Sequence, residues 1–280
     1  MGASGPEADV QRVGASGRAR APERHALRLV LVAALSATAW AALLAWSASP
    51  YARYLEHSGW DQAGALATLC RSIPQGALII PALLYALAWL LMIAAMMLPT
   101  TLPLLDIFRR ITASRRDAGA LMARVVSGYA VAWLAFGLLA HGLDSGLHIL
   151  AGKFDWLVVR GGLVGAIILI AAGAFQFSAL KYRCLERCRT PFAFINERWH
   201  GRRPPREAFR IGLEHGVFCV GCCWALMLVM FVVGMGSLGW MLLLAAAMAA
   251  EKNLPWGRRL RTPLGVGLIA WGGALAAASL

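Results

Sequence analysis

Long runs of apolar residues, separated by shorter polar segments, fill the chain from residue 26 onward. A bilayer core about 30 Å thick needs roughly 20 apolar residues for one helical crossing. The runs that come near this length cover residues 26–47, 77–98, 121–143, 161–180, 212–234, 239–252 and 263–280. Because the sixth run is short, we predict about seven spans (six to seven). The predicted fold class is all-α, a polytopic transmembrane helix bundle.

The segment before the first run has a different composition. Residues 1–25 are rich in Gly, Ala, Ser and Arg and show no apolar periodicity, which is typical of a disordered basic tail. Residues 26–280 are predicted to form a single transmembrane helical domain. The longest polar connection in it, 181–211, is strongly basic and is predicted to be a cytoplasmic loop.

Composition excludes an ordinary soluble globular protein, since 59% of the residues are hydrophobic and the mean hydropathy is +0.63. A net charge of +13 would suggest nucleic acid as a partner of a soluble chain. Here 23 of the 27 Lys and Arg residues fall in the tail and in alternate connections between spans. By the positive-inside rule this places the amino terminus in the cytoplasm, so we predict membrane lipid and no nucleic acid as the partner of the basic segments.

Five of the six cysteines lie in two clusters. His215, Cys219, Cys222 and Cys223 fall within an arc of about 100° on one helix, at the start of the predicted fifth span. Adjacent residues of a helix diverge by about 100°, so Cys222 and Cys223 are awkward ligands for one ion and one of them can be simple packing.

The second cluster is Cys184 and Cys188, one helical turn apart if the fourth span continues as a helix. Both clusters then lie at the same membrane depth, where they can converge on one ion. Thiolates are soft ligands that suit Cu(I) or Zn(II), and imidazole suits both. Neighbouring basic residues, including Lys181, Arg187 and Arg189, are expected to favour the thiolate form. Packing of small buried residues is the alternative interpretation.

Met92, Met96 and Met97 lie near the same end of the predicted second span. Thioethers bind Cu(I) weakly and exchange it quickly, which suits transfer. Methionine also fills gaps in helix packing, and only the shared depth with the cysteines favours a metal role. Met230 and Met227 would extend the row of soft ligands along the fifth span.

The chain carries no Walker loop, dinucleotide-binding glycine pattern, zinc-protease His-Glu-x-x-His or hydrolase Gly-x-Ser-x-Gly. These absences argue against an enzyme built on the familiar soluble catalytic machinery.

Three motifs carry a family resemblance. They are Met-x-x-x-Met-Met-Leu-Pro at 92–99, Leu-Lys-x-x-Cys-Leu-x-x-Cys-Arg-x-Pro at 180–191 and Gly-x-x-x-Gly-x-x-Cys-x-Gly-Cys-Cys-Trp at 212–224. Together they resemble a bacterial family of predicted metal-binding integral membrane proteins, some regarded as copper chaperones of tyrosinase-type copper oxidases. The resemblance spans roughly residues 77–262. It implies copper handling in a bacterial inner membrane, with the five clustered cysteines as the matching positions and a copper-dependent oxidase or other metalloprotein as acceptor.

The leading hypothesis is therefore a copper chaperone or copper-delivery factor that holds Cu(I) through Cys, His and Met ligands, with zinc as the second metal. A membrane thiol–disulfide oxidoreductase using Cys219 with Cys222 and Cys184 with Cys188 is the main alternative. It is disfavoured because the predicted topology places these thiols toward the reducing cytoplasm. A metal transporter and a structural subunit with packing cysteines are the remaining alternatives.

Overall fold

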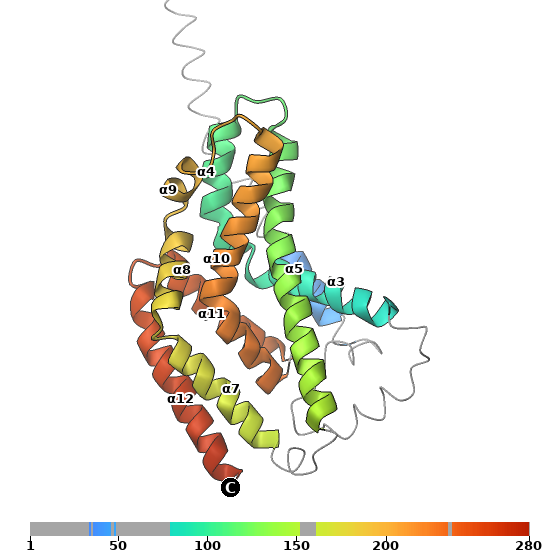
Figure 1. The fold of residues 1–280 in the computed structure, drawn as a ribbon, viewed down its shortest axis with the longest axis vertical. Helices are drawn as coiled ribbons and strands as arrows, with labels where there is room; N and C mark the ends of the chain where they lie inside the picture. Colours follow the sequence, from blue (N-terminus) through green and yellow to red (C-terminus); the bar gives the residue numbers. More distant parts are fainter. Residues whose placement is uncertain are drawn as a thin grey trace, which may run out of the picture.

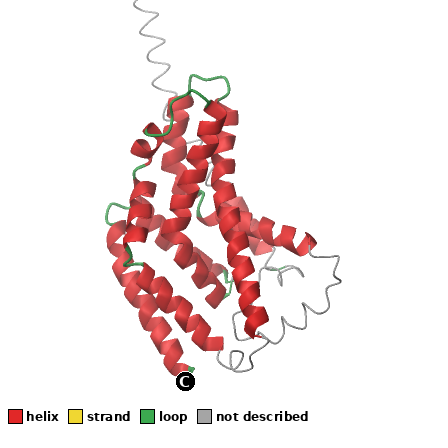
Figure 2. Ribbon diagram, in the orientation of Figure 1, coloured by secondary structure: helices red, strands yellow, loops and turns green. Residues whose placement is uncertain are grey.

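The computed structural model describes residues 36–45, 79–151, 161–234 and 237–279, together with Ala34 and Ala48. Within these ranges the chain is helical and has no strand, which confirms the predicted all-α class there (Figure 2). The predicted basic tail lies outside the described residues, and the predicted first span is described only in part, at Ala34 and over Ser36–Ala45.

Figure 1 shows how the helices are arranged. Their bounds are α3 Ile79–Met96, η3 Pro99–Thr101, α4 Leu102–Thr112, α5 Ala118–Ala151, α7 Gly161–Phe175, α8 Ala179–Arg189, α9 Pro191–Asn196, α10 Pro204–Val233, α11 Leu238–Asn253, η4 Gly257–Leu260 and α12 Arg261–Ala278. Helix α10 packs against α5, α7, α8 and α11, and α12 packs along α7. The main apolar core therefore lies around α10.

Three described helices are long and apolar enough to cross a membrane: Ala118–Leu143, Pro204–Val233 and Gly257–Ala278. Two bent pairs raise the number to five if each pair is one span. They are Ala86–Met96 with Pro99–Thr112, bent by 51°, and Gly162–Phe175 with Ala179–Arg189, bent by 62°. The described part of the chain thus gives three to five candidate spans, and the predicted seven is not established. Helix α11, the predicted short sixth segment, is not among the candidates.

The connection 181–211 differs from the predicted loop, because most of it is helical. Helices α8 and α9 occupy its first half, and α10 begins at Pro204, eight residues before the predicted start of the fifth span. Proline is favoured at a helix start, where its missing N–H leaves no bond unmade. Basic residues spaced along amphipathic helices resemble a loop in composition, which explains the error.

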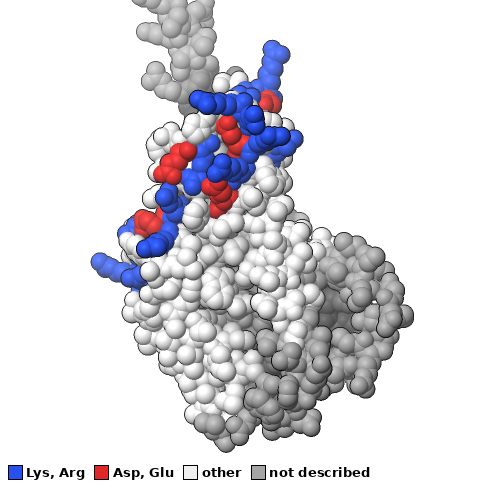
Figure 3. Space-filling model, in the orientation of Figure 1, with Lys and Arg blue, Asp and Glu red and all other residues white. Residues whose placement is uncertain are grey.

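Charged side chains gather toward one end of the molecule, over α4, α9 and the start of α10 (Figure 3). Several form ion pairs: Arg110 with Asp106, Arg115 with Asp117, Arg187 and Arg198 with Glu197, Arg210 with Glu214, and, between η4 and α8, Arg258 with Glu186. The hydrogen bond from Arg198 lowers the pKa of the Glu197 carboxyl, and that from Arg115 lowers the pKa of Asp117. The described segments predicted to share one side of the membrane therefore converge in space.

Glycines allow α5 and α10 to approach closely. A Cβ atom added to Gly212 of α10 would lie 2.7 Å from the carbonyl carbon of Val125 in α5, and one added to Gly128 of α5 would lie 2.8 Å from the backbone nitrogen of Leu213. Small residues at such crossings are the usual means of close helix packing in membranes.

Gly212→Ala is expected to destabilise the protein by about 1–3 kcal/mol, because its methyl group would meet backbone that cannot rotate away. The measurement is thermal unfolding of the purified protein in detergent. Gly267→Ala in α12 is the matched control, since nothing lies within 4 Å of its added Cβ atom. Equal stability of the two variants would contradict the close approach of α5 and α10.

Candidate metal centre

The cysteines of α10 lie in the middle of an uninterrupted helix. It begins at Pro204 and ends at Gly234, whose φ of +89° is a conformation that favours glycine. His215, Cys219, Cys222 and Cys223 are all buried in it. The predicted shared face of α10 is thus turned into the protein core.

Helix α8 brings the second cysteine pair to this face. A bend separates it from α7, and the Ser178 side chain caps its first turn by accepting a hydrogen bond from the Lys181 N–H. Cys184 and Cys188 then lie one turn apart on α8, as the sequence predicted for a continuing helix. Polar capping after the apolar helix α7 lets the chain change direction and lay α8 against α10.

The thiols of the two helices meet. Cys188 Sγ lies 3.9 Å from Cys222 Sγ, which lies 3.3 Å from Cys223 Sγ, and all five described cysteines are free thiols. Cys184 packs against Gly221, where an added Cβ atom would lie 2.6 Å from its sulfur. The helical twist does not keep the sulfurs of Cys222 and Cys223 apart, because their side chains bring the two sulfurs into contact.

Cys219 has different neighbours. Its sulfur lies 3.1 Å from the Tyr129 hydroxyl of α5 and 2.9 Å from the Lys252 ammonium nitrogen of α11. Its backbone carbonyl accepts a hydrogen bond from the Cys222 thiol at 3.1 Å. Cys219 therefore links the thiol cluster of α8 and α10 to polar groups of α5 and α11.

His215 lies one turn before Cys219, between aromatic rings. Its ring centroid is 6.1 Å from that of Tyr129 and 5.7 Å from that of Phe194. Its buried Nδ1 has no hydrogen-bond partner among the described residues. In that same part of the chain, no three His, Cys, Asp or Glu side chains are positioned to hold one metal ion as they stand. Metal binding by these groups would need side-chain adjustment.

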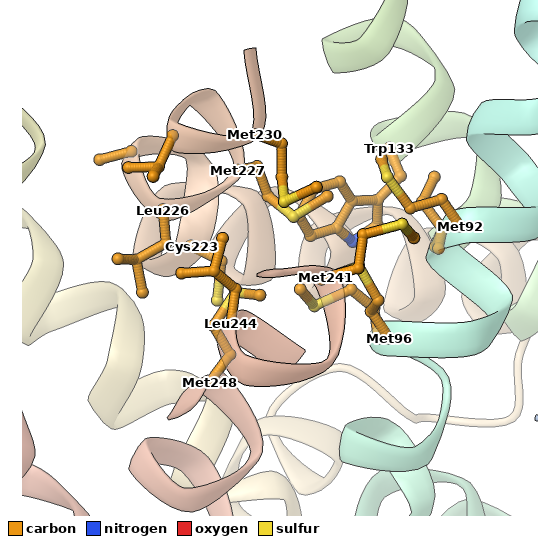
Figure 4. Close-up of a cluster of buried hydrophobic side chains, with 14 of the residues drawn as sticks. Met92, Met96, Trp133, Cys223, Leu226, Met227, Met230, Met241, Leu244 and Met248 are labelled. Atoms are coloured by element: carbon orange, nitrogen blue, oxygen red, sulfur yellow. The ribbon is translucent and has the colours of Figure 1, made fainter. Parts of the chain in front are cut away.

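Methionines form a layer beside the thiols. Seven of the ten in the chain are buried in one core: Met92, Met96, Met97, Met227, Met230, Met241 and Met248. They come from α3, α10 and α11, and Figure 4 shows labelled members pointing into one cluster around Trp133, with Cys223 at its edge. The predicted trio of α3 thus belongs to a larger set, in which Met241 and Met248 were not anticipated.

The basic residues expected beside the thiols have other partners. Lys181 pairs with Glu251 at 2.8 Å and donates to Gln176, while Arg189 donates to the backbone carbonyls of Glu251 and Leu254. Arg187 pairs with Glu197 near the surface. The cation that contacts a cysteine is Lys252, which sequence reasoning missed. Because it lies at the end of an apolar segment, in the sequence it looks like one of the basic residues that set membrane orientation.

Comparison with known proteins adds a family. Residues 86–275, more than half of the chain, match the family described as PpoB2, copper chaperone. The chain belongs to this copper chaperone family. The match covers α5, α7, α8, α10 and α11, and so includes all five clustered cysteines. No curated protein and no solved structure matches the chain.

Membership in the PpoB2 copper chaperone family fits the resemblance seen in the three sequence motifs. It gives the chain a role in copper handling and a copper-using protein as its partner in general terms. Soft sulfur ligands in a buried position are chemically suited to copper.

Proposed function

We propose that this chain holds Cu(I) in the thiol cluster of α8 and α10 and delivers it to a copper-dependent enzyme, such as an oxidase. The observation that carries the proposal is the meeting of Cys188, Cys222 and Cys223 from two helices, with sulfur separations of 3.9 and 3.3 Å. Small rotations of these side chains can direct several sulfurs at one ion. Cys184 and Cys219 border the cluster, and His215 is a further donor one turn away.

The ligand chemistry favours Cu(I) over zinc. Structural zinc sites are closed tetrahedra of Cys and His ligands, and thioethers have no place in them. Thioethers and thiolates together select Cu(I). The buried methionine layer begins next to Cys223, so an ion leaving the thiols would meet weaker ligands of the same soft character.

The proposed location is a bacterial inner membrane, with the charged end of the molecule in the cytoplasm. The candidate spans and the one-sided gathering of Arg and Lys support this orientation. The thiol cluster then lies in the cytoplasmic half of the bundle. Reducing conditions on that side keep thiols free and copper as Cu(I).

The two alternative functions have weaker support. Cys184, Cys219, Cys222 and Cys223 are buried and Cys188 is half-buried, which shields most of these thiols from the partner disulfide that a thiol–disulfide oxidoreductase must reach. A transporter needs ligands through the whole depth of the membrane, and the methionine layer extends the thiols only part of the way along α10. Delivery to a partner protein is the function that the described site supports best.

Replacing Cys188, Cys222 and Cys223 together with Ser is expected to remove most of the bound copper, because the oxygen of Ser is a poor ligand for Cu(I). The protein is purified anaerobically with Cu(I), and metal per chain is measured by elemental analysis. Cys70→Ser is the matched control, since Cys70 belongs to neither cysteine motif.

Unchanged copper in the triple variant, with the fold intact by circular dichroism, would refute the proposed site. Zinc in place of copper in the wild-type protein would reassign the metal. A reversible two-electron thiol titration without any bound metal would favour the oxidoreductase.

Changing Met92, Met230 and Met241 together to Leu is expected to slow copper transfer to a soluble Cu(I) chelator by about tenfold or more, with the copper content unchanged. Leu nearly preserves the packing volume but removes the thioether ligand. Met122→Leu is the control, because Met122 packs against the second, separate core. Equal transfer rates for wild type and triple variant would leave the methionines as packing residues only.

A cysteine introduced at Arg115, in the turn between α4 and α5, tests the orientation. In a Cys70→Ser background it should react with an impermeant maleimide only after the membrane is opened. Lys153→Cys, in a connection predicted outside, should react in intact spheroplasts. The reverse pattern would place the charged end outside and overturn the proposed orientation.

A further inference from the structure

Lys252 is the buried cation nearest to the thiols. Only 6% of its surface is exposed, and its ammonium nitrogen lies 2.9 Å from Cys219 Sγ, 3.3 Å from Thr100 Oγ1 and 3.7 Å from Met97 Sδ. These groups come from α10 and from the end of α3 with the η3 turn, while Lys252 itself ends α11. Three separate parts of the fold thus build a pocket for one positive charge.

No carboxylate balances this charge among the described residues. The neighbouring Glu251 points to Lys181, with which it forms a pair whose two side chains are each 1% exposed. A buried ammonium group without a compensating partner is strongly unfavourable. The Cys219 sulfur, as a thiolate, is the group in contact that can supply the balancing charge, and the Tyr129 hydroxyl 3.1 Å away can donate to the same sulfur.

The partners of Lys252 are unusual for a lysine and ordinary for a soft metal ion. A thiol and a thioether both contact the ammonium group, and they belong to the thiols and to the methionine layer that the proposed function links to Cu(I). Lysine normally seeks oxygen acceptors as a compact, strongly hydrated charge. The position between Cys219 and Met97 therefore has the ligands of a Cu(I) site and is filled by a monovalent cation that belongs to the chain.

We propose that the Lys252 ammonium group occupies, in the empty protein, the position between Cys219 Sγ and Met97 Sδ that Cu(I) takes in the loaded protein. Copper binds by displacing the ammonium group, and the ammonium group returns to these sulfurs when copper leaves. This inference rests on the proposed copper function and names the residue that weakens copper binding enough for delivery.

The exchange keeps one positive charge against the Cys219 thiolate, because Cu(I) and ammonium each carry one. The displaced ammonium group stays part of the chain and keeps its charge, so the protein as a whole gains the charge of the copper ion. No electron is transferred, and the copper–sulfur bonds replace the ammonium–sulfur contacts. The four-carbon stem of lysine is flexible, and Lys252 lies in the last turn of α11, where the side chain can turn away from Cys219 without unwinding the helix.

Lys252→Leu, which removes the cation without adding a sulfur ligand, is expected to raise the affinity for Cu(I) by about 5- to 150-fold, the usual size of a coupling between two sites that compete or cooperate. Removal of the tethered competitor should also slow copper release to a chelator by a similar factor. Affinity is measured on the purified full-length protein by competition with bathocuproine disulfonate, with Ag(I) as a second, redox-stable monovalent probe. Lys252→Arg keeps the cation and should bind no more tightly than wild type.

A double variant provides the matched control. Lys181→Leu with Glu251→Gln removes the other fully buried lysine among the described residues together with its partner charge, so no unpaired charge is left. Its Cu(I) affinity per folded molecule should equal that of wild type. Lys252→Gln, which keeps a polar end, replaces Lys252→Leu if the latter does not fold.

Copper affinity that is unchanged or lower in Lys252→Leu, or raised equally in the Lys181 and Glu251 double variant, would overturn the displacement proposal. If the wild-type protein binds copper normally, either result contradicts the displacement proposal but not the proposed function. Absence of copper from the wild-type protein itself would instead refute the proposed function.

Discussion

The close approach of α5 and α8 to α10 is the packing constraint on which the site depends. Gly212 lies against the backbone of Val125, Gly216 lies against Tyr129, and Gly221 leaves room for the Cys184 sulfur. A larger residue at any of these positions would push a neighbouring helix outward. Without that approach, Cys188 could not reach Cys222, and Tyr129 could not reach Cys219.

Burial of charge is the second constraint, and the two buried lysines meet it differently. Lys181 lies against a carboxylate and an amide oxygen, the partners that a structural ammonium group normally has. Its pair with Glu251 joins α8 to α11. Lys252, the next residue along α11, faces sulfur atoms instead. Adjacent residues of α11 thus take part in a structural ion pair and in contacts with the proposed copper ligands.

The proposed copper site combines strong sulfur ligands, the thiols, with weak ones, the thioethers. Free thiols gather where α8 crosses α10, and thioethers from three helices continue from there through the core (Figure 4). A delivery protein must hold its ion firmly enough to exclude other ligands and loosely enough to release it. In the proposed site, strong ligands lie next to weak ones and to a cation that would compete with copper, an arrangement that would meet both requirements. This arrangement is consistent with membership in a copper chaperone family.

The sequence alone determined the helical class, the soft-ligand chemistry and the individual residues on the cysteine face of α10. These follow from local properties: apolar run length, helical spacing and the ligand preference of sulfur. The motifs around Met92, Cys184 and Cys219 also indicated the family to which the chain belongs.

Only the tertiary structure decided which groups meet. The bend at Ser178 aims α8 at α10, and the end of α11 brings Lys252 to Cys219 and Met97. In the sequence, Lys181 and Lys252 are two basic residues at the ends of apolar segments. Nothing in their local sequence shows that Lys181 pairs with a carboxylate and that Lys252 contacts a thiol. Contacts across 33 to 155 residues depend on how helices cross, and that depends on packing rather than on local pattern.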